Sequence, residues 1–147
     1  MLAAHEIAHR TVEITDLFPT QVTVGMREVN FKRRRWREKN GDQAADYLAA
    51  HRIPVILGPE NRHFIIDRHH LARALHDEGV KGLPVSILAT MNELEFDEFW
   101  AALETRGWTH PFDGDGQQCA YSDIPNAVCN LIDDPFRSLA GALKRAG

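Results

Sequence analysis

The fold of this chain is decided by residues 64–75, which read FIIDRHHLARAL. The apolar run 64–66 is typical of a buried strand, and a helix with one apolar face begins directly after it. The N–H groups in the first turn of a helix have no partner within the helix, and together with the helix dipole they attract anions. We therefore expect an anion site at the point where this strand meets the helix.

Four basic side chains crowd this end of the predicted helix: Arg68, His69, His70 and Arg73. A phosphate docked there would meet backbone donors, two imidazoles and two guanidinium groups. Asp67 could cap the helix, hold a metal ion that bridges phosphates, or take a proton from a hydroxyl. A plainer interpretation stays open, in which Asp67 only caps the helix and the two histidines are surface residues.

A second stretch with candidate chemistry is LFPTQVTVGMRE, residues 17–28. Gly25 stands at the entrance to a predicted helix, where the lack of a side chain allows close approach of the backbone. Arg27 and Glu28 lie in the first turn of that helix. Glu28 is a candidate general base or magnesium ligand, although its carboxylate could also serve only to complement the helix dipole.

The rest of the chain alternates strand and helix patterns. These patterns predict strands at 11–18, 53–57, 63–66 and 83–88, and helices at 26–40, 42–51, 67–78, 92–107 and 135–145. Gly79 and Gly107 are expected to end helices, and Asn92 is expected to cap one, with Glu95 in the capping-box position. The order indicates one compact α/β or α+β domain over 1–147, with a loose N-terminal segment over 1–11.

The composition limits the function classes. The chain has 147 residues, of which 44% are apolar and 26% charged, and its net charge is −4. A protein that mainly grips a nucleic-acid backbone usually carries a basic excess, so DNA is a possible but not a favoured partner. The basic run 32–37 is more typical of a solvated helix face. No stretch has the length and apolar content of a signal peptide or a membrane span, so we expect a cytoplasmic protein without a membrane partner.

The sequence offers little for a structural metal site. Cys119 and Cys129 are too few for a disulfide framework or a cysteine zinc site, and we expect two small, partly buried thiols. The histidines within 63–76 lack the i, i+4 spacing that zinc-binding helices use. Residues 113–116, DGDG, start like a calcium loop, but Ile124 stands where such a loop needs a glutamate, so a turn is expected.

Four segments together resemble the ParB-like nuclease family, which belongs to the ParB/sulfiredoxin superfamily. They are PTQVTVGMREV, VILGPENRHFIIDRHHLARAL, FWAALETRGWTHPFDGDG and DDPFRSLAGALKRAG. The resemblance runs from near Val12 to the C-terminus. It implies an α+β ParB/sulfiredoxin-like fold, a single compact domain with a small mixed sheet and helices packed around it. It also implies that this fold binds a nucleotide, with the phosphates at residues 67–70. Some members of the superfamily are free-serine kinases, partition proteins bind CTP, and sulfiredoxins carry a catalytic cysteine at this place.

The sequence departs from each of these branches. Residues 67–75 contain no cysteine, so the sulfiredoxin chemistry is missing, and the chain after Leu88 leaves no room for the helix-turn-helix domain of partition proteins. Arg68 replaces a glycine of the kinase motif. Gln21 lies close to the place of the base glutamate of the kinases, and Glu28 is the nearest carboxylate that could replace it.

The residues and the resemblance suggest an enzyme that transfers phosphoryl from ATP or ADP, with Mg²⁺, to a small hydroxyl compound such as an amino acid. The expected nucleotide- and phosphate-binding residues are Gln21, Gly25, Arg27, Arg68, His69, His70 and Arg73. The expected catalytic residues are Glu28, Asp67 and His69, with Asp67 also the expected metal ligand. Two alternatives stay open: a metal-dependent nuclease that acts on DNA, and a non-catalytic module that responds to a nucleotide.

Overall fold

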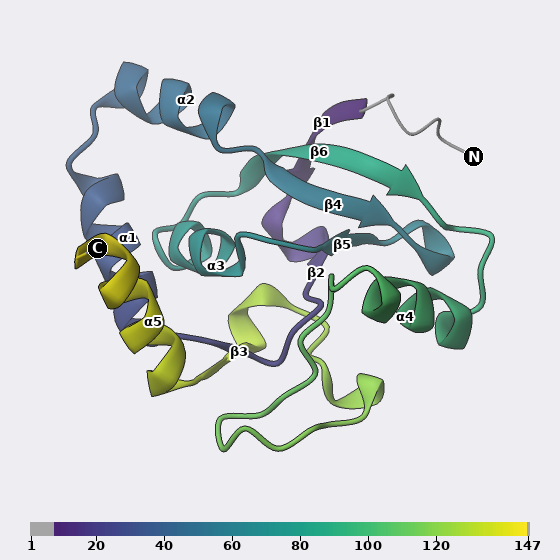
Figure 1. Ribbon diagram of the computed structural model, residues 1–147. Helices are drawn as coiled ribbons and strands as arrows, with labels where there is room; N and C mark the ends of the chain where they lie inside the picture. Colours follow the sequence, from purple (N-terminus) through teal and green to yellow (C-terminus); the bar gives the residue numbers. More distant parts are fainter. Residues whose placement is uncertain (1–7, 147) are drawn as a thin grey trace.

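The computed structural model describes residues 8–146 and contains a five-stranded mixed sheet with helices on both faces (Figure 1). In spatial order the strands are β1 (Ala8–Glu13), β6 (Gly82–Thr90), β4 (Ile53–Leu57), β5 (His63–Ile65) and β2 (Leu17–Phe18). The helices are α1 (Met26–Arg37), α2 (Gly41–Ala50), α3 (His69–Asp77), α4 (Phe96–Thr105) and α5 (Pro135–Ala146). The expected α+β domain is confirmed.

The sheet mixes the two pairing directions. β1 runs antiparallel to β6, and β4 runs parallel to β6 and antiparallel to β5, which in turn pairs in parallel with β2. The predicted hairpin of β4 and β5 is confirmed. Its turn contains the 3₁₀ helix η2 (Pro59–Asn61), in which Glu60 and Asn61 adopt positive φ angles.

The sheet buries a separate apolar core on each face. Successive residues of a strand point to opposite faces. In β4, Val55 belongs to the core under α1 and α3, whereas its neighbour Ile56 belongs to the core under α4. In β5 the same alternation places Ile65 in the first core and Phe64 in the second. Strands buried on both faces read as continuous apolar runs, which is why residues 53–57 were readable as a strand.

Several local predictions about turns are confirmed. Gly79 and Gly107 follow the ends of α3 and α4 with φ angles of 82° and 70°, the left-handed conformation that favours glycine at this position. The segment 113–116 is a turn, in which the Asp113 carboxylate accepts the N–H groups of residues 115 and 117. Cys119 is partly buried as expected, but Cys129 is exposed.

Three predicted boundaries are wrong. The single strand predicted over 11–18 is divided by the 3₁₀ helix η1 (Ile14–Asp16), and β1 already begins at Ala8. The end of the expected loose segment 1–11 is therefore strand, because it pairs with β6, while residues 1–7 lie outside the described residues. Helix α3 begins at His69 and not at residue 67. Helix α4 is capped by Glu95, which forms a capping box with Glu98, and not by Asn92.

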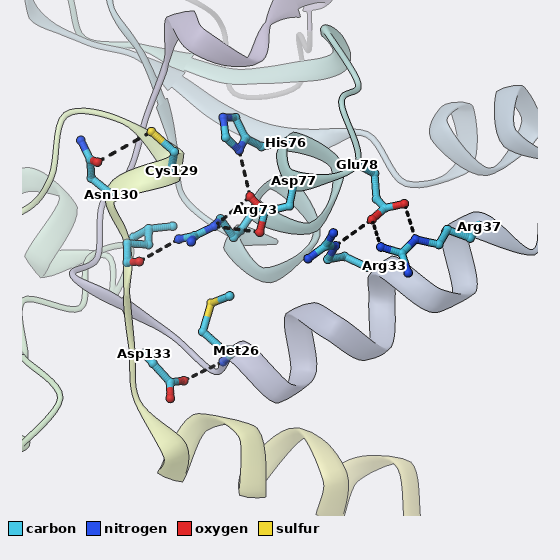
Figure 2. Close-up of polar contacts among 11 residues, drawn as sticks. Met26, Arg33, Arg37, Arg73, His76, Asp77, Glu78, Cys129, Asn130 and Asp133 are labelled. Carbon is cyan, nitrogen blue, oxygen red and sulfur yellow. Dashed lines mark hydrogen bonds and ion pairs between the residues drawn. The ribbon is translucent and has the colours of Figure 1, made fainter.

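The C-terminal segment packs against the start of α1. Beyond the 3₁₀ helices η3 (Tyr121–Asp123) and η4 (Val128–Asn130), β7 (Ile132–Asp133) pairs in parallel with β3 (Thr23–Val24). The Asp133 carboxylate accepts the N–H of Met26 at 2.7 Å (Figure 2). A Cβ atom added to Gly25 would lie 2.5 Å from the backbone nitrogen and Oγ of Ser138. The start of α5 is thus held directly on the start of α1.

Replacing Gly25 by alanine is expected to destabilise the protein by about 1–3 kcal/mol, because the new methyl group overpacks against the backbone of α5. Urea unfolding of the variant and the wild type measures this difference. Gly41→Ala is the matched control, since a Cβ atom there meets nothing within 4 Å. A Gly25→Ala protein as stable as the Gly41→Ala protein would contradict the close approach of α5.

Candidate functional site

A pocket of about 680 Å³ opens where α1, α2, α3 and the start of α5 converge. This volume lies within the range of roughly 300–1,000 Å³ that is usual for small-molecule sites. Six of the residues predicted from the sequence line it: Gln21, Glu28, Asp67, Arg68, His69 and His70. The structure therefore brings together the two stretches that the sequence marked as candidates for chemistry.

The junction of β5 and α3 forms one wall of the pocket. Arg68 adopts a left-handed conformation with φ 65° and ψ 33°, which turns the chain from strand to helix within one residue. Arg68 is thus the N-cap, and the Asp67 carboxylate accepts only the N–H of Arg68, at 2.7 Å. The idea that Asp67 merely caps the helix is therefore wrong. The first bond of the helical ladder is donated by Ala72, so the N–H groups of residues 69–71 lie outside the ladder.

The two adjacent histidines hold the segment 19–25 against α3. The Nε2 atom of His69 accepts the N–H of Thr20 at 3.1 Å, and the Nε2 atom of His70 accepts the N–H of Gly25 at 2.9 Å. Accepting a hydrogen bond at Nε2 requires a neutral ring with its proton on Nδ1. The idea that both are surface residues is wrong, because His69 is buried and both line the pocket.

Burial keeps both imidazoles uncharged. Burial, and then the charge of the nearby Arg137, lower the pKa of His69 to about 3. Burial and then Arg137 also lower the pKa of His70 to about 4, although Glu28 and Asp67 oppose the shift. A phosphate in this pocket would therefore meet two neutral rings, which add no positive charge.

Arg137 supplies a positive charge to the pocket. It comes from the first turn of α5 and reaches the Gln21 side chain, whose Oε1 accepts from it at 3.4 Å. Burial lowers its pKa, and the neighbouring Asp134 opposes that shift. Reasoning from the sequence did not single out Arg137. Its segment, DDPFRSLAG at 133–141, was noticed only as part of the family resemblance.

A buried carboxylate stands on α1. Glu28 is 9% exposed, lines the pocket and lies 3.8 Å from the ammonium group of Lys32, one helical turn further on. Lys32 also lines the pocket and is the part of the basic run 32–37 that does so. The pocket thus offers three carboxylates, Glu28, Asp67 and Asp134, next to the cations Lys32, Arg68 and Arg137.

Aromatic rings form the remaining wall. Tyr47 of α2 stacks on His51 with ring centroids 4.0 Å apart and an interplanar angle of 21°. The ammonium group of Lys39 lies over the Tyr47 ring, 4.6 Å from its centroid. Phe136, which is 76% exposed, lines the pocket from α5. Sequence reasoning missed these rings, although the i, i+4 spacing of residues 47 and 51 on one helix was a usable signal.

Comparison with known proteins bears on the family and on the fold of this chain. Residues 10–147 match the family described as "putative ParB-like nuclease". The chain belongs to this ParB-like family. Its structure is also similar to the crystal structure of protein Atu1540 from Agrobacterium tumefaciens, with a TM-score of 0.89 and 44% sequence identity, over 97% of this chain and 70% of that one. A search of curated proteins found no match.

Three predicted site residues of the ParB-like protein lie elsewhere. Arg73 is bound by the Asp77 carboxylate at 3.1 Å and by the Leu131 carbonyl at 2.7 Å, away from the pocket lining (Figure 2). It therefore ties α3 to the segment before β7. Gly25 serves the close approach of α5, and the backbone N–H of Arg27 donates to Ser138 Oγ. None of the three lines the pocket.

Two arginines of the basic run of the ParB-like protein pair with Glu78, the residue that directly follows α3. Glu78 accepts from Arg33 and Arg37 at 2.7 Å, as Figure 2 shows. Hydrogen bonds from these two guanidinium groups lower the pKa of Glu78 to about 2. Arg34, Arg35 and Arg37 are exposed, as expected of a solvated helix face, whereas Arg33 is half-buried beside Glu78. Among residues 8–146, no helix is long and apolar enough to cross a membrane.

Proposed function

We propose that this ParB-like protein binds a nucleotide, ATP or ADP, and transfers its terminal phosphoryl group to a small hydroxyl compound such as an amino acid. One observation carries the proposal. The N-terminus of α3, the half-buried cation Arg137 and the stacked pair Tyr47–His51 line the same pocket. An anion-binding helix end beside a cation suits phosphates, and a flat aromatic wall suits a base.

In this proposal, the phosphates of the nucleotide bind at the start of α3. Backbone N–H groups outside the helical ladder and the positive end of the helix dipole favour anions there. Arg137 and Arg68 add guanidinium groups, whose planar forks match phosphate oxygens. Gln21 is kept in place by donating to the Thr23 carbonyl at 2.6 Å, and it orients Arg137 in turn. The base then lies on the rings of α2.

The carboxylates of the pocket act on the hydroxyl compound that accepts the phosphoryl group. As the hydroxyl oxygen forms its bond to the terminal phosphorus, the bond from phosphorus to the bridging oxygen breaks and the shortened nucleotide leaves. Asp67 takes the hydroxyl proton in this step, and Glu28 assists it. His69 does not transfer protons in this proposal, because its Nε2 is bound to the Thr20 N–H. It positions the segment that carries Gln21.

Magnesium fits this pocket only together with the phosphates. Within residues 8–146, no three His, Cys, Asp or Glu side chains gather into a metal site. Mg²⁺ commonly uses one or two carboxylates plus substrate phosphates and waters, so Asp67 and Glu28 would suffice. When bound, the ion would neutralise charge on the phosphates. This donor set does not support an all-protein metal centre.

Asp67→Asn tests the proposal. Wild-type protein is expected to bind ATP or ADP in calorimetry and to consume it in the presence of one member of an amino-acid panel. The variant is expected to keep nucleotide affinity within a few fold and to lose turnover by about 10²–10⁴-fold, the usual contribution of a general base. Asp46→Asn, an exposed carboxylate on α2 outside the pocket, is the matched control.

Two outcomes would overturn this function. If wild-type protein binds no nucleotide and forms no phosphorylated product, the pocket has another ligand. If it binds nucleotide and consumes none with any hydroxyl compound, the non-catalytic alternative replaces the transferase. Degradation of plasmid or single-stranded DNA with Mg²⁺ or Mn²⁺, abolished by Asp67→Asn, would support the nuclease alternative instead.

A further inference from the structure

A second pocket of about 280 Å³ lies between α4, the end of β2 and the segment 121–126. It shares no lining residue with the candidate nucleotide site. Its volume falls just below the range usual for small-molecule sites, so it suits a short stretch of chain better than a whole metabolite. In Figure 1, α4 lies on the side of the molecule away from α1 and α5.

Aromatic rings in fixed orientations form the walls of this pocket. Trp100 and Tyr121 stack with ring centroids 5.3 Å apart and an interplanar angle of 9°. The hydroxyl of Tyr121 donates to the Glu104 carboxylate at 2.7 Å, which fixes that ring. Phe64 meets the Trp100 ring edge-on at 81°. Phe64 and Trp100 are buried and form the floor of the pocket. An incoming ring can contact the half-buried rings of Phe18, Phe96 and Tyr121 without prior rearrangement.

The pocket is more suited to a cationic than to an anionic ligand. The guanidinium of Arg62 lies over the rings of Phe18 and Phe96, 4.7 Å and 5.4 Å from their centroids. Its charge is also paired with Glu60 at 2.9 Å, so Arg62 acts as part of the wall. Asp97 lines the same pocket and is exposed, and within residues 8–146 no ion-pair partner is found for its carboxylate.

We propose that this pocket binds an extended, proline-containing peptide segment that carries a basic residue. Rigid proline rings pack on aromatic faces, and a polyproline II chain loses little entropy on binding. The carbonyl groups of such a chain have no internal partners, and the Ser122 hydroxyl and Asn126 amide in the lining can donate to them. Asp97 then pairs with the basic side chain. The site is independent of the proposed nucleotide chemistry.

The probe is a capped nonapeptide of prolines with a central arginine, titrated into the full chain labelled with ¹⁵N. We expect saturable shifts of the Trp100 indole N–H and of the amides in 121–126 that are not proline. Tyr121→Ala is expected to weaken binding by about tenfold, because a stacking wall is lost. Asp97→Lys is expected to weaken binding by about fivefold or more, since the side chain at position 97 then repels the arginine of the probe instead of attracting it. Asp46→Lys is the matched charge control.

The controls separate this site from non-specific contacts. Replacing the central arginine of the probe by glutamate should weaken binding by about fivefold, and replacing the prolines by glycine should abolish it. Equal binding of the glutamate or glycine probe would overturn the proposal, as would shifts confined to residues 67–71. Asp97→Lys changes an exposed side chain, so its effect is readable even if Tyr121→Ala perturbs folding. Absence of any saturable shift would also overturn it.

Discussion

Replacing Arg137 by glutamine is expected to weaken the binding of ATP or ADP by about 10–100-fold. Hydrogen bonds to charged groups contribute roughly 1.5–3 kcal/mol, and every 1.4 kcal/mol is tenfold in a dissociation constant. The loss should be large here, because Arg137 is partly buried and the two adjacent imidazoles are neutral. No charge on the histidines can replace the one that is removed. Calorimetry with each nucleotide and Mg²⁺ measures the change.

Two control variants separate the effect of the Arg137 charge from the effect of its planar guanidinium group and from that of the protein's overall charge. Arg137→Lys keeps the charge but loses the planar fork, so an intermediate affinity is expected. Arg34→Gln removes an exposed charge on α1 outside the nucleotide pocket, and its affinity should stay within about twofold of wild type. If Arg137→Gln binds nucleotide as Arg34→Gln does, the phosphates do not lie beside Arg137.

The site could be predicted from the sequence only where its parts are local. The strand-to-helix change at 64–75 lies within one window of residues, so both the anion-attracting helix end and its Asp67 were readable. Arg137 is distant in the sequence, and it reaches the pocket through the two-residue ladder of β3 and β7. Such a short ladder has no periodicity that a sequence pattern could reveal.

Predictions based on residue type alone were incomplete for the basic side chains of α3. Arg73 was expected to bind phosphate, but the i, i+4 partner Asp77 on the same helix holds its guanidinium. The i, i+4 spacing of Arg73 and Asp77 was visible in the sequence, and it predicts an ion pair on the helix instead of a phosphate contact. The histidines were placed in the pocket correctly, whereas their hydrogen bonds to residues 20 and 25 depend on tertiary packing. Sequence spacing carries no information on such distant acceptor–donor pairs.

Acidification is expected to destabilise the protein through His69 and His70. Their pKa values in the folded state are lowered to about 3 and about 4, below the ordinary value of 6.5. The unfolded chain therefore binds more protons below pH 6.5, and stability falls as the pH drops from there toward 4. The slope approaches 1.4 kcal/mol per pH unit for each such histidine. Urea unfolding at pH 7, 6 and 5 measures the loss.

His70→Gln isolates one of the two contributions. A glutamine oxygen can still accept the Gly25 N–H but does not titrate, so the variant should lose about 1–2 kcal/mol less stability than wild type between pH 7 and 5. The charged groups that face this ring are the same in both proteins: Glu28, Lys32, Asp67 and Arg137. His9→Gln, in the exposed strand β1, should follow the wild-type curve. If His70→Gln and wild type lose stability in parallel, His70 is not the neutral acceptor that holds residues 19–25 against the nucleotide pocket.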